Sequence, residues 1–256
     1  MKRCRNEYSL SVKKEKIMDF NEFKNGLNEN FKKQNISLTE EQCKNFYEYM
    51  KALIEWNNKI NLTAILEPKE IILKHFYDSI TINKYMRDKE KVIDVGTGAG
   101  FPGVPLKIIN KGIKITLLDS LNKRINFLEE IKNILNLKDI ETIHGRAEDY
   151  GQDKRYRGKF DVCTSRAVAP LNVLLEYMVP FIKKDGICVC MKGQDVEEEI
   201  NKAQNALKVL GCEIENVETL KLTENENVRN IIIIRKKEST NLKYPRKAGL
   251  SKKNPL

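Results

Sequence analysis

The run VIDVGTGAGFPGVPL, from Val92 to Leu106, constrains the fold more than any other stretch of this 256-residue chain. An apolar, strand-like segment meets four glycines within eight residues, followed by a second apolar segment. Glycine lets the backbone turn tightly and approach another group closely. A strand, a glycine-rich loop and a helix in this order are typical of α/β proteins that bind a small molecule at the loop.

From residue 91 onward, strand-like and helix-like segments alternate. The last two strands are separated only by the turn TENEN, so they are expected to pair antiparallel. Strands are predicted at 91–95, 114–119, 140–144, 160–165, 186–191, 212–222 and 228–235, and helices at 103–110, 122–136, 147–151, 170–182 and 195–210. This order predicts an α/β fold: a doubly wound, Rossmann-like sheet with an antiparallel edge strand. Such an edge strand is usual for class I methyltransferases that use S-adenosylmethionine (SAM).

Ahead of the sheet, residues 18–90 predict a small N-terminal helical region. Thr39 and Gln42 have the spacing of a capping box, and Pro68 is expected at a first helical position. We therefore expect four parts: a disordered extension (1–17), the helical region (18–90), a SAM-dependent methyltransferase domain (91–237) and a basic C-terminal tail (238–256).

The glycine loop suits two ligands. A nicotinamide cofactor requires G-x-G-x-x-G, which Gly98, Gly100 and Gly103 satisfy, with an acid about 20 residues later that Asp119 supplies. The position of the loop favours SAM instead, because the strand ends at Val95 and the sequence DVGTGAG is the acid-x-G-x-G-x-G pattern of SAM sites. We expect SAM to be bound by a loop that contains Asp94, Gly96, Gly98 and Gly100. Asp119 is expected to accept hydrogen bonds from the ribose hydroxyls.

Positive charge gathers at the two ends of the chain, whose formal net charge is +10. Residues 1–16 hold six Lys/Arg against two acids, and residues 235–256 hold eight against one. This distribution indicates a polyanionic partner, although basic tails also serve only to keep proteins soluble. Tyr244 is expected to stack on a base and the prolines to keep the tail extended. The predicted phosphate contacts are Lys192, Lys243, Arg246, Lys247, Lys252 and Lys253.

Several other classes of protein are disfavoured. No apolar run approaches the roughly 18 residues of a membrane span, and there is no apolar signal core, so we expect a cytoplasmic protein without a membrane partner. The six cysteines form no zinc-type pair of CxxC motifs, and no metal site is expected. Cys188 and Cys190 are expected to be small buried residues on one face of a strand.

Several blocks of the sequence together resemble the RsmG family, also called glucose-inhibited division protein B. The resemblance covers roughly residues 40 to 256. The blocks are WNNKINLTAI (56–65), KHFYDSI (74–80), VIDVGTGAGFPGVPLKI (92–108), LLDSLNKRINFL (117–128), GRAED (145–149), TSRAVAPL (164–171) and YPRKAGLSKKNPL (244–256). One departure is Ser251, where the family pattern has a proline.

The resemblance implies a SAM-dependent enzyme that methylates N7 of one guanine, position 527 in the 530 loop of bacterial 16S ribosomal RNA. The partner it implies is this RNA within the small ribosomal subunit, and we expect the protein to act as a monomer. The residues that the resemblance places around the cofactor and active site are Gly96, Phe101, Ala147, Glu148 and Arg166.

The chemistry agrees with this reading. Guanine N7 carries a free lone pair, so such an enzyme needs positioning and not a general base. The sequence lacks the N/D-P-P-Y/F motif, and Cys163 lacks the Pro-Cys or Thr-Cys context of carbon-5 methylation. Arg166, at the end of the fourth strand, is the candidate catalytic residue: it is expected to hold guanine O6 or a phosphate. The alternative for Arg166 is an ion pair with Asp161 or Glu148.

Other roles stay open at this point. His144 is expected to be structural, whereas His75 either faces the substrate or packs a helix. The alternative functions are methylation of another RNA or of a small molecule, a non-catalytic factor in ribosome assembly, and an NAD-dependent oxidoreductase.

Overall fold

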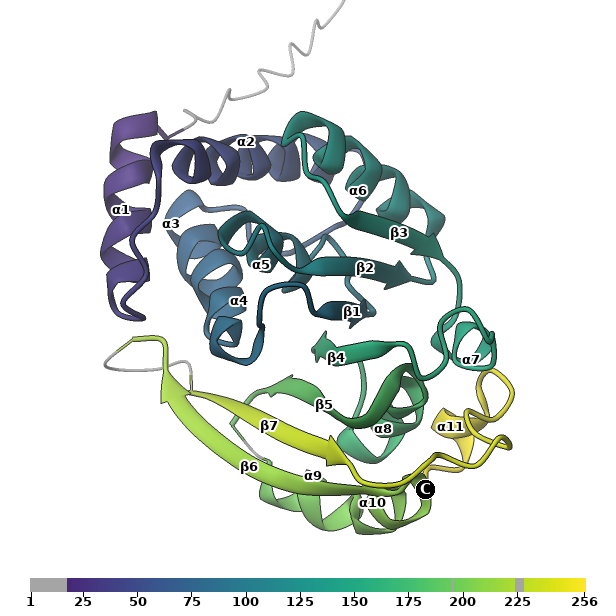
Figure 1. Cartoon of the computed structure of the whole chain (residues 1–256). Coiled ribbons are helices and arrows are strands. Elements are labelled where there is room, and N and C mark those ends of the chain that lie inside the picture. Colours follow the sequence, from purple (N-terminus) through teal and green to yellow (C-terminus); the bar gives the residue numbers. More distant parts are fainter. Residues whose placement is uncertain (1–17, 195, 224–227) are drawn as a thin grey trace, which may run out of the picture.

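The core of the protein is a seven-stranded sheet with strand order β3-β2-β1-β4-β5-β7-β6 (Figure 1). A computed structural model describes residues 18–194, 196–223 and 228–256. The predicted extension (1–17) and most of the turn TENEN lie outside the described residues. The strands are β1 (Lys91–Val95), β2 (Lys114–Asp119), β3 (Ile140–His144), β4 (Phe160–Arg166), β5 (Ile182–Lys192), β6 (Cys212–Lys221) and β7 (Val228–Lys236).

The direction of the strands follows the prediction. β1 to β5 are parallel, and β7 runs antiparallel to both β5 and β6. The antiparallel edge hairpin is thus confirmed. Parallel strands place all their carboxyl ends at one edge of the sheet, so the loops after β1, β2, β3 and β4 meet there.

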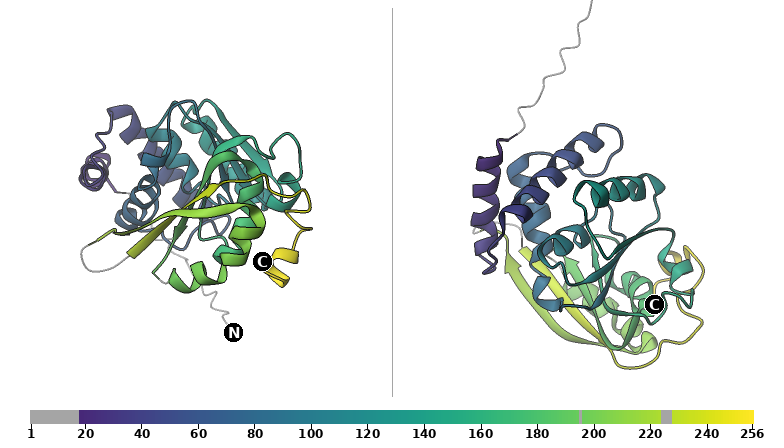
Figure 2. Two further views of the ribbon diagram at one scale, coloured as in Figure 1. Left: turned by 60° about the horizontal axis from the view of Figure 1, so that its bottom comes forward. Right: turned by 45° about the horizontal axis from the view of Figure 1, so that its top comes forward.

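Helices cover both faces of the sheet (Figures 1 and 2). Alternate strand residues face opposite sides: Ile231 and Ile233 of β7 join one hydrophobic cluster, and Ile232 and Ile234 join the other. The first face carries α1 (Phe20–Lys32), α2 (Glu40–Asn57), α5 (Gly103–Ile109) and α6 (Asn122–Ile134), and the second carries α8 (Leu171–Met178), α9 (Glu197–Lys202) and α10 (Gln204–Leu210).

Two helices differ clearly from their predicted ranges. The helix predicted over 170–182 ends at Met178, because Pro180 cannot donate to the helical ladder and lies in the 3₁₀ turn η3 (Val179–Phe181). The strand β5 then begins at Ile182, four residues before the prediction. The helix predicted over 195–210 is divided into α9 and α10 at Ala203.

The N-terminal helices belong to the same hydrophobic core as the sheet. The Thr39–Gln42 capping box that starts α2 and the first-turn position of Pro68 are both confirmed. Residues 68–85 continue as α3 (Pro68–Glu70), a π-helical segment η1 (Ile71–Tyr77), α4 (Asp78–Ile80) and η2 (Asn83–Tyr85). Tyr49 of α2 stacks on both Phe76 of η1 and Phe101 of the glycine loop. This packing joins the N-terminal helices directly to the loop.

The C-terminal tail is folded onto the protein rather than extended, so that prediction is wrong. Arg157 donates hydrogen bonds to the carbonyl oxygens of Thr240, Asn241 and Tyr244, and Tyr244 is buried. The short helix α11 (Leu250–Lys253) lies beside α7 (Ala147–Tyr150) (Figure 1). Burial of Tyr244 removes it as a platform for base stacking.

The fold predicts which glycine of the loop couples it to the N-terminal helices. Gly100 has φ +97°, and an added Cβ would lie within 3 Å of Tyr49, Val104 and Leu128. Gly100→Ala is expected to lower the free energy of unfolding by about 2 kcal/mol or more, from overpacking and backbone strain together.

Gly158 provides the matched control, since its φ is +64° but nothing lies within 4 Å of an added Cβ. Gly158→Ala is expected to cost only about 1 kcal/mol, from strain alone. Urea unfolding of both variants measures the difference, and equal losses would contradict the tight packing of Gly100.

Candidate active site

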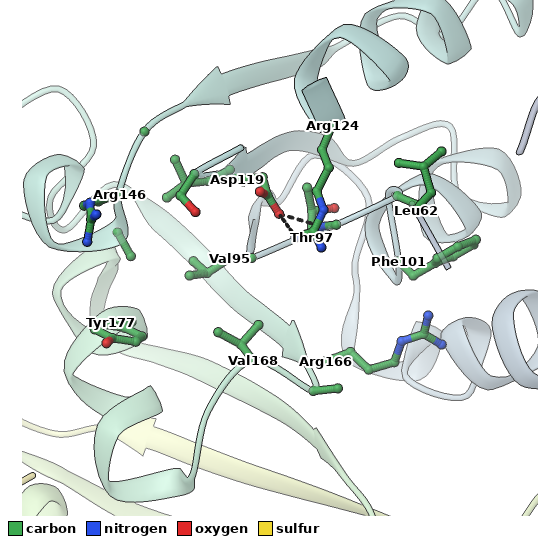
Figure 3. Close-up of a pocket in the computed structure, with 18 of the residues that line it drawn as sticks. Leu62, Val95, Thr97, Phe101, Asp119, Arg124, Arg146, Arg166, Val168 and Tyr177 are labelled. Atoms are coloured by element: carbon green, nitrogen blue, oxygen red, sulfur yellow. Dashed lines mark hydrogen bonds and ion pairs between the residues drawn. The ribbon is translucent and has the colours of Figure 1, made fainter. Parts of the chain in front are cut away.

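A pocket of about 650 Å³ opens at the carboxyl ends of β1, β2 and β4 (Figure 3). It extends from Arg146 and Tyr177 at one end to Leu62, Phe101 and Arg166 at the other. Its lining comes from six parts of the chain: 62–63 with 75, 95–99 with 101, 118–120 with 124, 145–148, 166–168 with 177, and 249 with 252. The pocket therefore lies where the sequence predicted a ligand.

Asp94 holds the glycine loop from beneath and does not line the pocket. Its Oδ2 accepts hydrogen bonds from Thr97 Oγ1 (2.7 Å) and from the N–H of Gly103 (2.9 Å). The carboxyl group is fully buried, and burial raises its pKa to about 7 despite these two bonds. Asp94 thus fixes both ends of the loop.

Gly96 and Gly98 shape the surface that a ligand meets. Both have a positive φ, +72° and +62°, which favours glycine. An added Cβ on Gly96 would lie 2.5 Å from Val168, whereas at Gly98 nothing lies within 4 Å. The backbone at Gly98 is therefore open to close approach by a ligand. Gly100 faces the N-terminal helices instead of the pocket.

Asp119 is placed where the sequence predicted it, at the end of β2 and on the pocket wall. Its side chain is nearly fully buried. Oδ2 accepts from the N–H of Gly98 (2.9 Å) and from Arg124 (3.3 Å), and Oδ1 accepts from the N–H of Leu121 (2.9 Å). A carboxylate offers about four lone-pair positions, so one remains for a ligand.

Ala147 and Glu148 line the far end of the pocket, beside the C-terminal tail. Glu148 is buried, and its Oε1 accepts a hydrogen bond from the N–H of Gly249 (3.1 Å). Gly249 and Lys252 line the same pocket. The tail therefore forms one wall of the site and orients Glu148.

Arg166 is held by the N-terminal helices. Its guanidinium donates to Asp78 (3.0 Å) and to the carbonyl of Lys74 (3.1 Å), and lies over the ring of Phe101. An ion pair was one alternative for Arg166, but its partner is neither Asp161 nor Glu148. Asp161 pairs with Lys183 instead. The partner, Asp78, is 2 % exposed and also receives Arg229.

His75 both packs a helix and faces the pocket, so the two readings of it are not exclusive. Its ring stacks on Phe101 with centroids 4.4 Å apart. Burial, together with the nearby charge of Arg166, lowers its pKa to about 3, so the ring is neutral at physiological pH. His144 lies outside the pocket lining, near the carbonyl of Ser120 (3.2 Å).

Of the basic residues predicted to contact phosphate, some form ion pairs within the protein and others are exposed. Lys192 is buried, donates to the carbonyl of Ala169 and pairs with Glu199. Arg246 makes a bidentate pair with Glu176, whose side chain is fully buried. Both are engaged within the protein, which argues against the predicted phosphate contacts. The exposed candidates are Lys243, Lys247, Lys252 and Lys253.

The sequence interpretation missed several residues of the site. Thr63 and Leu62 come from the block WNNKINLTAI and Asp78 from KHFYDSI, which were noted without a role for these residues. Arg124 and Arg146 lie in the blocks LLDSLNKRINFL and GRAED. The sequence signal that could have found these residues was their presence in the family blocks. That they meet at one pocket follows only from the tertiary fold.

The central strands β4 and β5 carry three buried cysteines. Cys163 is fully buried, and burial raises the pKa of its thiol. Cys188 and Cys190 are buried on one face of β5, as predicted. Among the residues that the structure describes, no cluster of His, Cys, Asp or Glu is arranged to hold a metal ion. Within the same ranges no helix combines the length and apolarity that a membrane span needs.

Solved structures share the fold. TYW2 from Pyrococcus horikoshii, in complex with MeSAdo, matches with a TM-score of 0.51 at 14% identity, covering 63% of this chain and 62% of that one. The cyclase SpnF matches with a TM-score of 0.54 at 11% identity, covering 77% and 96%. The sheet order and these matches define the Rossmann-like α/β fold of class I methyltransferases.

The sequence comparisons identify the family within this class. The family model described as rRNA small subunit methyltransferase G (GidB) matches residues 42–231. Relatives named ribosomal RNA small subunit methyltransferase G include one from Thermoanaerobacter sp. (strain X514), 50% identical over 89% of this chain and 96% of its own length. Another, from Clostridium botulinum (strain Loch Maree / Type A3), is 48% identical over 92% and 99%. The chain belongs to the rRNA small subunit methyltransferase G family.

The position of the tail predicts that Arg246 supports the site. Arg246→Ala leaves the Glu176 carboxylate buried without its partner and is expected to cost about 3 kcal/mol of unfolding free energy. Loosening α11 also weakens the Gly249–Glu148 bond, so SAM affinity measured by calorimetry should fall roughly tenfold.

Lys247→Ala is the control, since it removes the same charge from the next, exposed position. It should leave stability and SAM affinity nearly unchanged. If both variants bind SAM like the wild type, the tail does not support the pocket.

Proposed function

We propose that this protein transfers a methyl group from SAM to N7 of a single guanine of 16S ribosomal RNA, guanine 527 in the 530 loop. Membership of the rRNA small subunit methyltransferase G family, at about 50% identity over most of the chain, carries the proposal. The relatives bear the name of ribosomal RNA small subunit methyltransferases, and the pocket of this chain is intact.

The residues of the pocket suit SAM. The open backbone at Gly98 allows close approach, and the free lone pair of Asp119 suits a ribose hydroxyl. Ala147 and Glu148 lie one loop further along the sheet edge, where the adenine is expected. Asp94 and Gly100 act indirectly, by holding the loop. The residues proposed to form the cofactor site are Asp94, Gly96, Gly98, Gly100, Phe101, Asp119, Ala147, Glu148 and Arg166.

The site fits a reaction that needs no base. SAM supplies an electrophilic methyl group on a sulfonium. Guanine N7 is unprotonated near neutral pH and loses no proton when it is methylated. With a pKa of about 3, His75 has little basicity to offer, and Cys163 is buried as a thiol. The chain contributes alignment and electrostatics.

Arg166 is the proposed positioning residue for the base. The methylated guanine ring becomes cationic, which an isolated guanidinium nearby would oppose. Asp78, a carboxylate that Arg166 shares with Arg229, lies 3.0 Å from Arg166 and offsets part of its charge, so the guanidinium can serve as a donor beside the product.

An anionic macromolecule suits the surface around the pocket. Arg124, Arg146 and Lys252 line the pocket, and Lys243, Lys247 and Lys253 are exposed on the tail. A small-molecule substrate has no need of such a rim. The proposed partner is 16S ribosomal RNA in the small ribosomal subunit, in the cytoplasm, with the protein acting as a monomer.

The cofactor assignment predicts the effect of Asp119→Ala. Loss of the ribose contact and of the bonds to Gly98 and Leu121 should weaken SAM binding at least about tenfold in calorimetry. Asp161→Ala removes a carboxylate at the opposite end of the sheet and should bind SAM normally. NAD should not bind the wild type. Unchanged SAM affinity in Asp119→Ala means that the ligand lies elsewhere.

The reaction assignment predicts the product and the role of Arg166. Wild-type protein, radiolabelled SAM and small subunits from cells lacking this activity should give label in RNA that borohydride and aniline cleave at N7-methylguanine. Arg166→Ala should lower the single-turnover rate about 10²-fold through misalignment, with only partial recovery in Arg166→Lys because the guanidinium fork is lost. Labelled RNA that resists cleavage contradicts N7 as the target.

A further inference from the structure

The loop after α2 is fixed with Thr63 at the pocket. The side-chain Oδ1 of Asn57, the last residue of α2, accepts hydrogen bonds from the N–H groups of Leu62 (2.8 Å) and Thr63 (2.9 Å). Thr63 and Leu62 both line the pocket, and Leu62 lies at the end where Phe101 and Arg166 lie (Figure 3). The Thr63 hydroxyl therefore lies on a fixed loop of the pocket that is separate from the glycine loop.

The contact with Arg166 indicates which nitrogen of His75 carries the proton. A guanidinium can only donate, so Nδ1 of His75, 3.3 Å from Arg166, is the acceptor. The proton of the neutral ring then lies on Nε2, which is 2.8 Å from Thr63 Oγ1. With the proton on Nε2, His75 donates to Thr63.

This arrangement gives the hydroxyl proton of Thr63 no intramolecular acceptor among the described residues. Thr63 Oγ1 also accepts the N–H of Ile65 (3.0 Å), so both acceptor positions of the hydroxyl are filled. Within the described ranges, no side chain or carbonyl accepts the proton of Thr63. A hydroxyl with two filled acceptor positions acts only as a donor, and here it lies at a pocket.

We propose that Thr63 determines the specificity for the target base by donating a hydrogen bond to a purine carbonyl oxygen, O6 of guanine. The chain from Asp78 through Arg166 and His75 fixes the direction of that bond. This inference rests on the proposed function, because it takes guanine N7 as the methylated atom. O6 lies beside N7 on the same edge of the base.

The direction of the bond gives it selectivity. Adenine carries an amino group where guanine carries O6, and two donors facing each other cannot bond. N7 itself is not the acceptor, because its lone pair must stay free for the methyl group. A hydroxyl that can only donate thus selects a carbonyl beside N7 and rejects an amino group. Because the hydroxyl is neutral, it does so without placing a further positive charge beside the base.

The experiment combines a change in the protein with a change in the base. Thr63→Val removes the hydroxyl and keeps the shape, and Thr63→Ser retains the hydroxyl. The substrates are small subunits reconstituted with RNA that carries guanine, inosine or 2-aminopurine at the target position. Inosine keeps O6, whereas 2-aminopurine lacks it. Single-turnover rates and SAM affinities are measured for each protein.

Wild type should methylate guanine and inosine at similar rates and 2-aminopurine more slowly. Thr63→Val should methylate guanine about tenfold more slowly than the wild type and lose most of this preference for O6, because the donor is gone. Thr63→Ser should restore it. Comparing the ratio of rates between proteins cancels the intrinsic effect of O6 on the reactivity of N7.

Two further variants separate positioning from folding. His75→Phe keeps a ring against Phe101 and removes the donor to Thr63; it should reduce the O6 preference, with no further reduction when combined with Thr63→Val. Thr81→Val removes a buried hydroxyl from the same helical region, one that donates to the carbonyl of Asp78 and does not line the pocket. It should leave the O6 preference unchanged.

The outcomes distinguish a failure of the role of Thr63 from a failure of the proposed function. If wild type forms no N7-methylguanine, the proposed function fails and the role of Thr63 fails with it. If wild type forms it and Thr63→Val keeps the full O6 preference, only the role of Thr63 is overturned. A loss of SAM affinity in Thr63→Val that matches its loss of rate also overturns it, since the hydroxyl then binds the cofactor.

Discussion

The ion pair between Asp78 and Arg166 joins the two halves of the site. Asp78 belongs to the N-terminal helices and Arg166 ends a central strand, and their side chains are 2 % and 15 % exposed. A buried ion pair loses so much hydration that it adds little net stability. What it provides is geometry: Arg166 is held over Phe101 and against His75, so this end of the pocket has one arrangement.

The glycine loop is held in the same way from its other sides. Asp94 fixes Thr97 and Gly103 from within the sheet, and Asp119 fixes Gly98 from the neighbouring strand. Tyr49 donates to the carbonyl of Ala99 from α2. A loop held from three directions keeps its shape without a ligand, so little ordering has to accompany binding.

The sheet could be predicted from the sequence because its signals are local. Apolar runs and turn residues mark each strand, and the short link before β7 requires an antiparallel partner. The loop and the position of Asp119 follow from the same local pattern. The partner of Arg166 could not be predicted, since Asp78 lies 88 positions away and the charge of a residue does not name its partner. The predicted phosphate contacts of Lys192 and Arg246 are wrong for the same reason. Both residues were interpreted as surface charges, and only the folded structure shows that each pairs with a carboxylate.

The tail shows how this limit affects a functional reading. Its charge suggested an extended segment that contacts RNA, yet Tyr244 is buried, Arg246 pairs with the buried Glu176, and the N–H of Gly249 donates to Glu148. The exposed lysines stand on this anchored segment, with Lys252 in the helix that follows Gly249. A phosphate bound at Lys252 therefore meets a backbone already tied to the cofactor end of the pocket. The proposed phosphate contact and one wall of the pocket thus belong to the same short segment. A helix of this length is not stable alone, and the buried carboxylates of Glu148 and Glu176 hold the segment in place.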